Sequence, residues 1–203
     1  MIEDIYAKRE LCKVFTKDIP DSDTMMSIIQ KTHRLVPSKQ NLMPYKIHVL
    51  GPDCVNFKEE LFKITSGTDS KVNTNFQVFA PYVLIFTCRL ANPNPHVQRQ
   101  IENGHKYKSC FPETYNSNSC VRKAYLEVGK WSTIFSGLCL EKSIDISYTK
   151  CFSFDKKDWT TLPFVKDNPI FVVSAGYHDK TQVMKIPGET KPDFDEVVCF
   201  ERE

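Results

Sequence analysis

The sequence predicts an α+β fold in which helices flank a central mixed or antiparallel sheet. Helical patterns come first along the chain, and short apolar strands then alternate with helices. A chain of 203 residues that is 41% hydrophobic can bury a sizeable core in one domain. Its seven glycines form neither a GxGxxG nor a GxxxxGKS/T loop, which argues against a Rossmann domain or a P-loop enzyme.

The first half of the chain predicts three helices and one strand. Pro20 ends the preceding segment, and Asp21 or Ser22 can cap the helix that follows. The pair Gly51-Pro52 ends an apolar strand. The predicted elements are helices over 2–9, over 22–36 and over 53–64, and a strand over 46–50. In the third helix, Phe57, Leu61, Phe62 and Ile64 are expected to face inward.

The second half predicts buried strands around one long helix. Residues 82–88 and 170–176 are nearly continuous apolar runs, which are typical of strands buried on both faces. Apolar side chains recur every three or four positions from 121 to 139 and predict a long helix, capped by Asn118 or Ser119. A further strand is predicted over 144–148 and a short helix over 155–162.

One domain is predicted over 1–203, with two appendages. Residues 89–119 are polar and contain Asn-Pro-Asn-Pro, so a lid or insertion is predicted there, with a short helix inside it. Residues 177–203 are polar except for a short apolar run near the end. They predict a C-terminal arm that lies against the body or against a partner subunit.

Composition limits the possible functions. The net charge of +2 requires neither a nucleic-acid nor a membrane partner, and no apolar run reaches the length of a membrane span. The acidic start lacks the features of a signal peptide. The eight cysteines form no CxxC, so they predict reduced thiols, no metal site and a cytoplasmic protein.

Two short segments carry the candidate chemistry. Residues 8–15, KRELCKVF, place basic groups at the end of a short helix, where they could pair with a phosphate or simply form a solvated basic face. Residues 36–45, VPSKQNLMPY, place small and amide side chains on a turn between two prolines. Taken alone, this second segment reads as an ordinary capped turn. Cys12 lies between Arg9 and Lys13, so a lowered thiol pKa is an alternative to a plain buried thiol.

Together these segments resemble the two flavin-contacting signatures of the nitroreductase family, which binds FMN between two subunits. Three later segments extend the resemblance along the chain: 80–86, 127–141 and 175–198. The resemblance implies a nitroreductase-like fold with a long central helix at the dimer interface. It also implies that Arg9 pairs with the FMN phosphate and that Lys13 reaches the ribityl chain and the pyrimidine edge.

The resemblance places the remaining cofactor contacts on several loops. Ser38 and Asn41 would reach the flavin from the second subunit. Cys151 falls near the glycine that lets the family's backbone approach flavin N5, and Lys191 could replace a late basic pair. The full set of predicted cofactor-binding residues is Arg9, Lys13, Pro37, Ser38, Asn41, Asn73, Cys151 and Lys191.

The chain departs from the family pattern near the phosphate. Leu11 replaces a serine, so one hydroxyl donor is missing, and Glu10 adds a negative charge. Met43 and Tyr45 replace the family's glutamine and tryptophan, and Gly188 and Thr190 stand where a basic pair is usual. Each lost charge-assisted bond is worth about 1.5–3 kcal/mol, so these changes predict weaker FMN binding.

The resemblance implies an FMN-dependent oxidoreductase. Hydride would pass from NAD(P)H through the flavin to a small aromatic acceptor, such as a nitro compound or quinone, by a ping-pong scheme in a homodimer. Two alternatives remain open. One is a non-catalytic binding module with the same fold and a weakened flavin site. The other is a flavin-modifying or dehalogenating branch that uses residues 89–119 as a lid.

Overall fold

The computed structural model describes residues 2–65, 75–105, 117–153, 155–182 and 194–198. Its helices are α1 (Ile2–Ala7), α2 (Ser22–Leu35), α3 (Val55–Thr65), α4 (Pro95–Glu102), α5 (Ser117–Glu141) and α6 (Phe194–Val197). Its strands are β1 (Tyr45–Leu50), β2 (Tyr82–Cys88), β3 (Asp145–Thr149) and β4 (Pro169–Gly176). Short 3-10 turns are η1 (Lys39–Asn41), η2 (Phe76–Phe79), η4 (Lys156–Trp159) and η5 (Lys180–Gln182).

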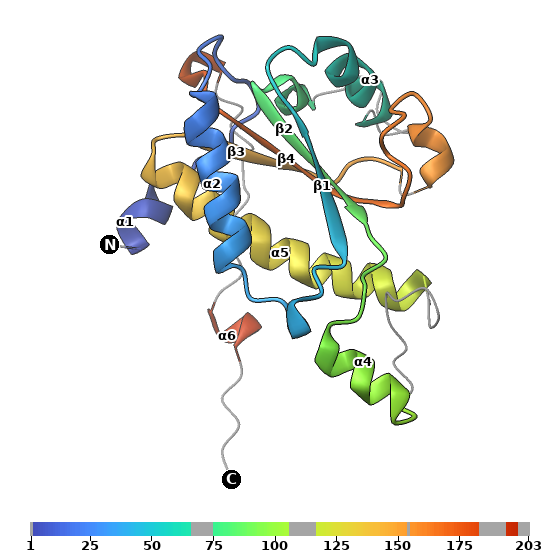
Figure 1. The fold of residues 1–203 in the computed structure, drawn as a ribbon. Helices are drawn as coiled ribbons and strands as arrows, with labels where there is room; N and C mark the ends of the chain where they lie inside the picture. The colour runs from blue at the N-terminus through green and yellow to red at the C-terminus, as the bar shows by residue number, and fades with distance from the viewer. Residues whose placement is uncertain (1, 66–74, 106–116, 154, 183–193, 199–203) are drawn as a thin grey trace.

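The four strands form one antiparallel sheet in the order β1-β2-β4-β3 (Figure 1). The two apolar runs form the central strands β2 and β4, as predicted. Every residue of β2 is buried, because this strand has a neighbour on each side and side chains packed over both faces. The predicted α+β class is therefore confirmed. Of the two predicted kinds of sheet, mixed or antiparallel, the structure has the antiparallel one.

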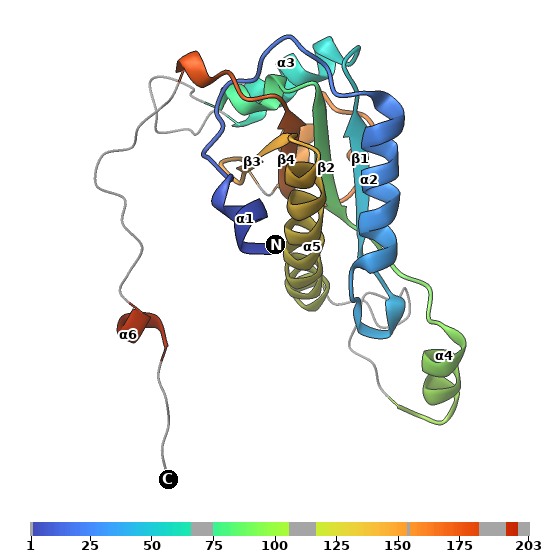
Figure 2. The same cartoon turned by 90° about the vertical axis from the view of Figure 1, so that its left-hand side faces the viewer.

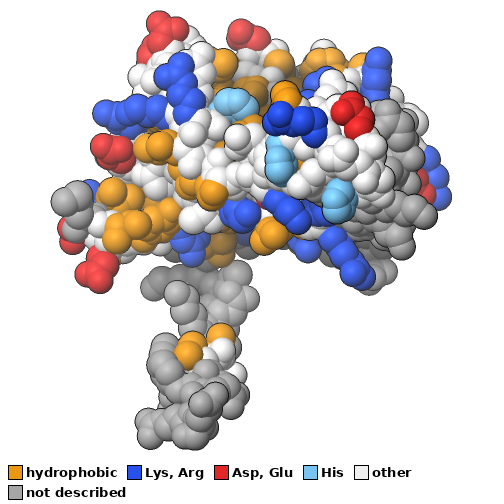
Figure 3. Space-filling view, turned by 60° about the horizontal axis from the view of Figure 1, so that its bottom comes forward, with side chains coloured by type: hydrophobic (Ala, Val, Ile, Leu, Met, Phe, Trp, Pro, Cys, Tyr) orange, Lys and Arg blue, Asp and Glu red, His pale blue; other side chains and the backbone are white. Residues whose placement is uncertain are grey.

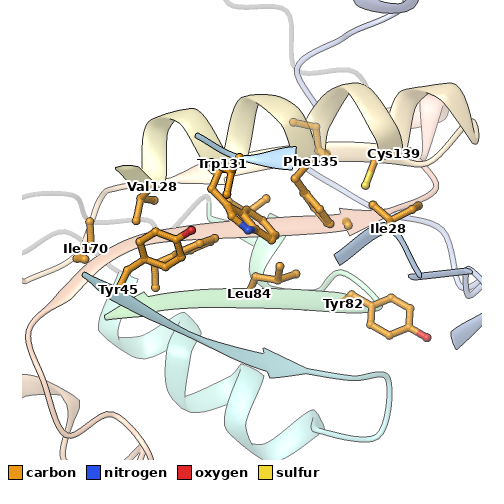
Figure 4. Close-up of a cluster of buried hydrophobic side chains, with 14 of the residues drawn as sticks. Ile28, Tyr45, Tyr82, Leu84, Val128, Trp131, Phe135, Cys139 and Ile170 are labelled. Atoms are coloured by element: carbon orange, nitrogen blue, oxygen red, sulfur yellow. The ribbon is translucent and has the colours of Figure 1, made fainter. Parts of the chain in front are cut away.

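Helices α2 and α5 cover one face of the sheet, and α3 covers the other (Figures 1 and 2). Between α5 and the sheet, Trp131 stacks on Phe135 at 4.9 Å and meets Phe86 of β2 at 5.1 Å, measured between ring centroids (Figure 4). On the opposite face, Leu61 and Trp159 belong to a second buried cluster. Helix α5 is thus the central support of the larger core.

Element boundaries follow local capping with two exceptions. The side chain of Asp21 accepts the backbone N–H of Thr24 at 2.8 Å and starts α2 as predicted. The predicted cap of α5 is wrong, because the helix begins at Ser117, before Asn118 and Ser119. The helix predicted over 155–162 is also wrong. Only the single turn η4 forms there, because Trp159 is buried and its Nε1 donates to the carbonyl of Ser153 at 2.8 Å.

The inward face of α3 differs from the prediction at one position. Leu61 is buried, but Phe57 remains 36% exposed. Lys58 is buried instead, and its ammonium donates to the carbonyl of Pro81 at 2.9 Å. A lysine can take a core position when its aliphatic stem packs and its charged end reaches an acceptor. Burial lowers the pKa of Lys58.

The two predicted appendages are described in part. Within 89–119, α4 forms the expected short helix, and residues 106–116 lie outside the described residues. Within 177–203, α6 lies apart from the sheet and its covering helices (Figures 1 and 2). Among the described helices, none is both long and apolar enough to cross a membrane.

Candidate functional site

The basic segment follows α1 along the edge of the domain. The Tyr6 hydroxyl donates to the carbonyl of Thr133 on α5 at 2.7 Å, which attaches α1 to the long helix. Farther along, the N–H of Thr16 donates to the carbonyl of Tyr177 at 2.7 Å, and that of Asp179 donates to the carbonyl of Val14 at 2.9 Å. The segment is therefore fixed at both ends, against α5 and against the end of β4.

Arg9 and Lys13 lie on this fixed segment. The Arg9 side chain is exposed, and Lys13 is half-buried. Burial raises the pKa of Tyr148 on β3, and the nearby positive charge of Arg9 acts against that rise. Arg9 is therefore within electrostatic reach of the edge strand, in a position to meet an anion from solvent.

Glu10 is turned toward a buried histidine. Its Oε2 lies 3.4 Å from Nδ1 of His178, whose side chain is only 1% exposed. The backbone N–H of His178 donates to Oδ2 of Asp145 at 3.0 Å. The Glu10 carboxylate thus faces the His178 ring.

Cys12 is a buried thiol. Burial, followed by the negative charge of Asp145, raises its pKa to about 12. The alternative of a lowered thiol pKa is therefore wrong, because burial dominates the shift and the charges that contribute to it are those of acidic groups. None of the six described cysteines forms a disulfide bond.

The second segment forms a compact turn after α2. Pro37 is exposed, next to Val36 at the end of that helix. The half-buried Ser38 accepts the N–H of Met43 on its Oγ at 3.0 Å, and Asn41 is exposed at the tip. Ser38 therefore closes the turn internally and leaves the Asn41 side chain facing solvent.

Three non-glycine residues of this turn have left-handed backbone angles. The φ values are 56° at Gln40, 54° at Asn41 and 43° at Met43. Each such residue costs about 1–2 kcal/mol for an L-amino acid. Strained residues of this kind persist only when surrounding contacts determine them, and they concentrate at functional sites.

Contacts from distant segments hold the turn in place. Oε1 of Glu127 on α5 accepts the N–H of Lys39 at 3.2 Å. Arg89 donates to the carbonyls of Leu42 at 2.8 Å and of Met43 at 3.2 Å. Asn94 caps α4 and also donates to the carbonyl of Gln40 at 2.6 Å. The turn is thus braced by α5 and by the start of the 89–119 region.

The remaining predicted residues are less informative. Cys151 is exposed two residues beyond the end of β3, beside Lys150, whose ammonium lies 5.0 Å from the centre of the Tyr125 ring. Asn73 and Lys191 lie outside the described residues. Among the described residues, no group of three His, Cys, Asp or Glu side chains could hold a metal ion.

One chain does not bring its two signature segments together. Helix α1 lies on one side of α5, whereas α2 and the turn after it lie on the other side (Figure 2). The contacts on α5 are also separated along the helix, since Thr133 is six residues beyond Glu127 and the helix rises about 1.5 Å per residue. Within one chain, Arg9 and Asn41 therefore follow elements on opposite sides of α5.

The face that carries the turn is rich in cations. Figure 3 shows Lys, Arg and His side chains gathered across this face, with acidic side chains mainly toward its margins. Residues 31–46, which include the turn, contain the exposed side chains of Lys31, His33, Arg34, Lys39 and Lys46 and no acidic residue. Such a face favours anionic ligands.

Sequence reasoning missed the residues that brace the turn. Arg89, Asn94 and Glu127 lie far from it in sequence, so local patterns could not connect them. Glu127 did leave a signal, because it places a carboxylate on the apolar stripe of the long helix, where charge is rare unless it is paired.

Comparison with known proteins identifies the fold. No family model matches this chain, and no curated protein matches it. A nitroreductase family protein from Streptococcus pneumoniae has 17% identity and a TM-score of 0.70, with 99% of this chain and 100% of that chain covered. A proposed NAD(P)H:FMN oxidoreductase from Staphylococcus epidermidis has 15% identity and a TM-score of 0.75, with 99% and 96% covered.

A third structure is that of a proposed nitroreductase in complex with FMN from Exiguobacterium sibiricum. It has 13% identity and a TM-score of 0.72, with 99% of this chain and 97% of that chain covered. These likenesses extend over almost the whole chain. The chain therefore has a nitroreductase-like fold, which confirms the prediction made from the two sequence segments.

Proposed function

We propose that this chain is an FMN-dependent oxidoreductase that works as a homodimer. The observation that carries the proposal is the position of the two signature segments on opposite sides of α5. In a two-fold dimer packed through α5, the basic segment of one subunit would meet the turn of the other, giving two equivalent sites. The nitroreductase-like fold supports this arrangement, as does the FMN bound in the Exiguobacterium sibiricum protein.

The exposed face of α5 supports a subunit interface. Leu126 is 63% exposed on this helix. A Cβ added at Gly129, three residues later, would meet no atom within 4 Å. A large apolar side chain next to an uncovered glycine suits close packing against another helix. The C-terminal arm, with Val197 exposed on α6, is proposed to lie against the same partner.

The described residues suit FMN. Arg9 would pair with the phosphate, and Lys13 would place a fixed positive charge near the flavin edge that becomes anionic on reduction. Ser38 and Asn41 would contact the flavin from the partner side, with Pro37 shaping the approach. Bound FMN would supply the hydride chemistry that links NAD(P)H to a small aromatic acceptor. Leu11, which is 44% exposed, offers no hydroxyl and is expected to weaken phosphate binding.

The cationic face supports an anionic electron donor. NAD(P)H carries a pyrophosphate, and the Lys, Arg and His side chains around the turn would attract it. The region 89–119 begins beside the same turn through Arg89 and Asn94, so we propose that it acts as a lid over the acceptor. We further propose that Asn73, Cys151 and Lys191 contact the cofactor and that the protein is cytoplasmic.

Two alanine variants of the basic segment and one control variant just beyond it test the proposal. Arg9→Ala and Lys13→Ala should each weaken FMN binding by at least about tenfold, because each removes a charge-assisted contact. Lys17→Ala removes an exposed lysine from the same stretch of chain and serves as the control. FMN affinity is read from flavin fluorescence, and turnover from NAD(P)H oxidation with a quinone.

Two results would contradict the proposal. In the first, all three variants bind FMN as the unmodified protein does, which would remove Arg9 and Lys13 from the site. In the second, the unmodified protein takes up no FMN, which would favour a non-catalytic module with this fold.

A further inference from the structure

A buried carboxylate lies under the turn that carries Ser38 and Asn41. Glu127 occupies the core-facing side of α5, and its side chain is only 5% exposed. Burying a carboxylate costs several kcal/mol unless hydrogen bonds or a counter-charge compensate for it. A buried glutamate at this position is therefore expected to have compensating partners.

The partners of Glu127 point to the turn. Its Oε1 accepts the backbone N–H of Lys39 at 3.2 Å and lies 3.4 Å from Nζ of Lys130, one turn farther along the same helix. Its Oε2 has no hydrogen-bond partner among the described residues. Of these two partners, only the Lys39 N–H belongs to another element, and it directly follows Ser38.

The turn depends on such outside contacts. Gln40, Asn41 and Met43 have left-handed backbone angles. Such angles are unfavourable for residues other than glycine unless surrounding contacts stabilise them. The internal bond from Met43 N–H to Ser38 Oγ closes the turn but does not fix its position relative to α5. The bond between Lys39 and Glu127 fixes that position, because it joins the start of the turn to α5, which packs against the larger core.

A neighbouring group reports the charge of Glu127. Tyr45 lies under α5, with its ring directed toward the helix (Figure 4). Burial, followed by the negative charge of Glu127, raises the pKa of Tyr45 to about 12, while Arg89 acts in the opposite direction. Lys130 is thus the charged neighbour of Glu127 on α5, and Arg89, which donates to the turn, acts with Glu127 on Tyr45.

We propose that Glu127 is a positioning residue, which holds the turn so that Ser38 and Asn41 reach the cofactor bound in the interface. This inference rests on the proposed function, since it names a residue that acts on the same site. It assigns no contact between Glu127 and FMN. The effect of Glu127 is instead transmitted through the backbone of Lys39.

The first test needs no cofactor. Amide hydrogen exchange of Lys39 is measured by NMR in the apoprotein, in Glu127→Met and in Glu127→Gln. Methionine fills the buried space without an oxygen acceptor, so Lys39 should exchange at least about tenfold faster. Glutamine retains an acceptor oxygen and should restore protection. Equal Lys39 exchange in all three proteins would overturn the inference.

The second test measures FMN affinity. Glu127→Met should raise the FMN Kd about tenfold and change the visible circular dichroism of the bound flavin. The control is Val128→Ala, which makes a cavity at the next position of α5 and leaves the Lys39 contact intact. This control should lose stability and keep the FMN Kd of the unmodified protein.

A double-mutant cycle identifies the route of the effect. If Glu127 acts through the turn, Asn41→Ala should cost much less FMN affinity in the Glu127→Met background than in the unmodified protein. Independent effects of the two changes would contradict the inference, as would equal losses of affinity in Glu127→Met and Val128→Ala. If the unmodified protein binds no FMN, the proposed function fails, and the Lys39 exchange data still decide whether Glu127 holds the turn.

Discussion

Phe15 packs directly against the backbone of Gly176. A Cβ built at position 176 would lie 2.9 Å from Cδ1 of Phe15 and 2.6 Å from Cδ of Pro81, both too close for a side chain. Gly176 ends the central strand β4, and Phe15 ends the basic segment that carries Arg9 and Lys13. The absence of a side chain at Gly176 therefore determines where the basic segment can lie.

Gly176→Ala should disturb both the fold and the site. Overpacking of this kind typically costs about 1–3 kcal/mol, and relief of the clash should displace Phe15 together with its segment. We expect a lower free energy of unfolding in urea and weaker FMN binding. Gly51→Ala is the matched control, since a Cβ there meets no atom within 4 Å. Unchanged stability in Gly176→Ala would show that Phe15 is not confined by this contact.

Complementation between subunits should reveal a shared site. Arg9→Ala and Asn41→Ala each damage one half of every site in their own homodimers. In a mixed dimer, one site combines the intact Arg9 of one subunit with the intact Asn41 of the other. Mixing the two variants should therefore restore FMN binding at up to one site per mixed dimer. No recovery in a sample proven to contain mixed dimers would place both residues in one subunit's site.

The exposed face of α5 should control assembly. Leu126→Glu places a charge on the proposed interface and should shift the protein toward one chain mass of 23.5 kDa in light scattering. Met26→Glu changes another exposed apolar residue, on α2, and should leave the dimer intact. Dimers that survive Leu126→Glu at micromolar concentration would contradict an interface through this face.

His48 should make stability depend on pH. Burial, followed by the positive charge of Lys46, lowers the pKa of His48 below its ordinary value of 6.5. The unfolded chain then binds more protons than the folded one, so stability falls as pH drops through about 6.5. Between pH 7 and 5.5, His48→Gln should lose less stability in urea titrations than the unmodified protein.

The control for this effect is the exposed histidine of α2. His33→Gln should show the same pH dependence as the unmodified protein. If His48→Gln lost as much stability between pH 7 and 5.5 as the unmodified protein, groups other than His48 would cause the pH dependence.

Two cysteines should differ in reactivity. Cys12 is buried with a pKa raised to about 12, so at pH 8 it presents almost no thiolate. Cys151 is exposed. Iodoacetamide labelling is followed by peptide mass spectrometry. In the folded protein, Cys151 should be labelled at least about tenfold faster than Cys12. In urea, the two cysteines should be labelled at similar rates. Fast labelling of Cys12 in the folded protein would contradict its buried, protonated state.

Much of the fold could be predicted because its signals are local. The apolar runs at 82–88 and 170–176 form the central strands, and Asp21 caps α2 as its position suggests. The helix predicted over 155–162 failed because a tertiary contact overrides local preference there. The Trp159 ring packs into the core, and its indole N–H reaches the carbonyl of Ser153.

The candidate site was harder to predict than the fold. The two motifs predict Arg9 and Asn41 as site residues, but nothing local shows that they lie on opposite sides of α5. The braces of the turn come from Glu127, Arg89 and Asn94, which are some 45 to 90 positions away in sequence. Only the folded chain brings these groups to the backbone that they hold.

The visible absorption spectrum of the purified protein, followed by identification of any chromophore released on heating, shows whether this chain binds FMN. We expect flavin bands and release of about one FMN per subunit, either as purified or after incubation with FMN. A colourless protein that takes up no added FMN would contradict this expectation.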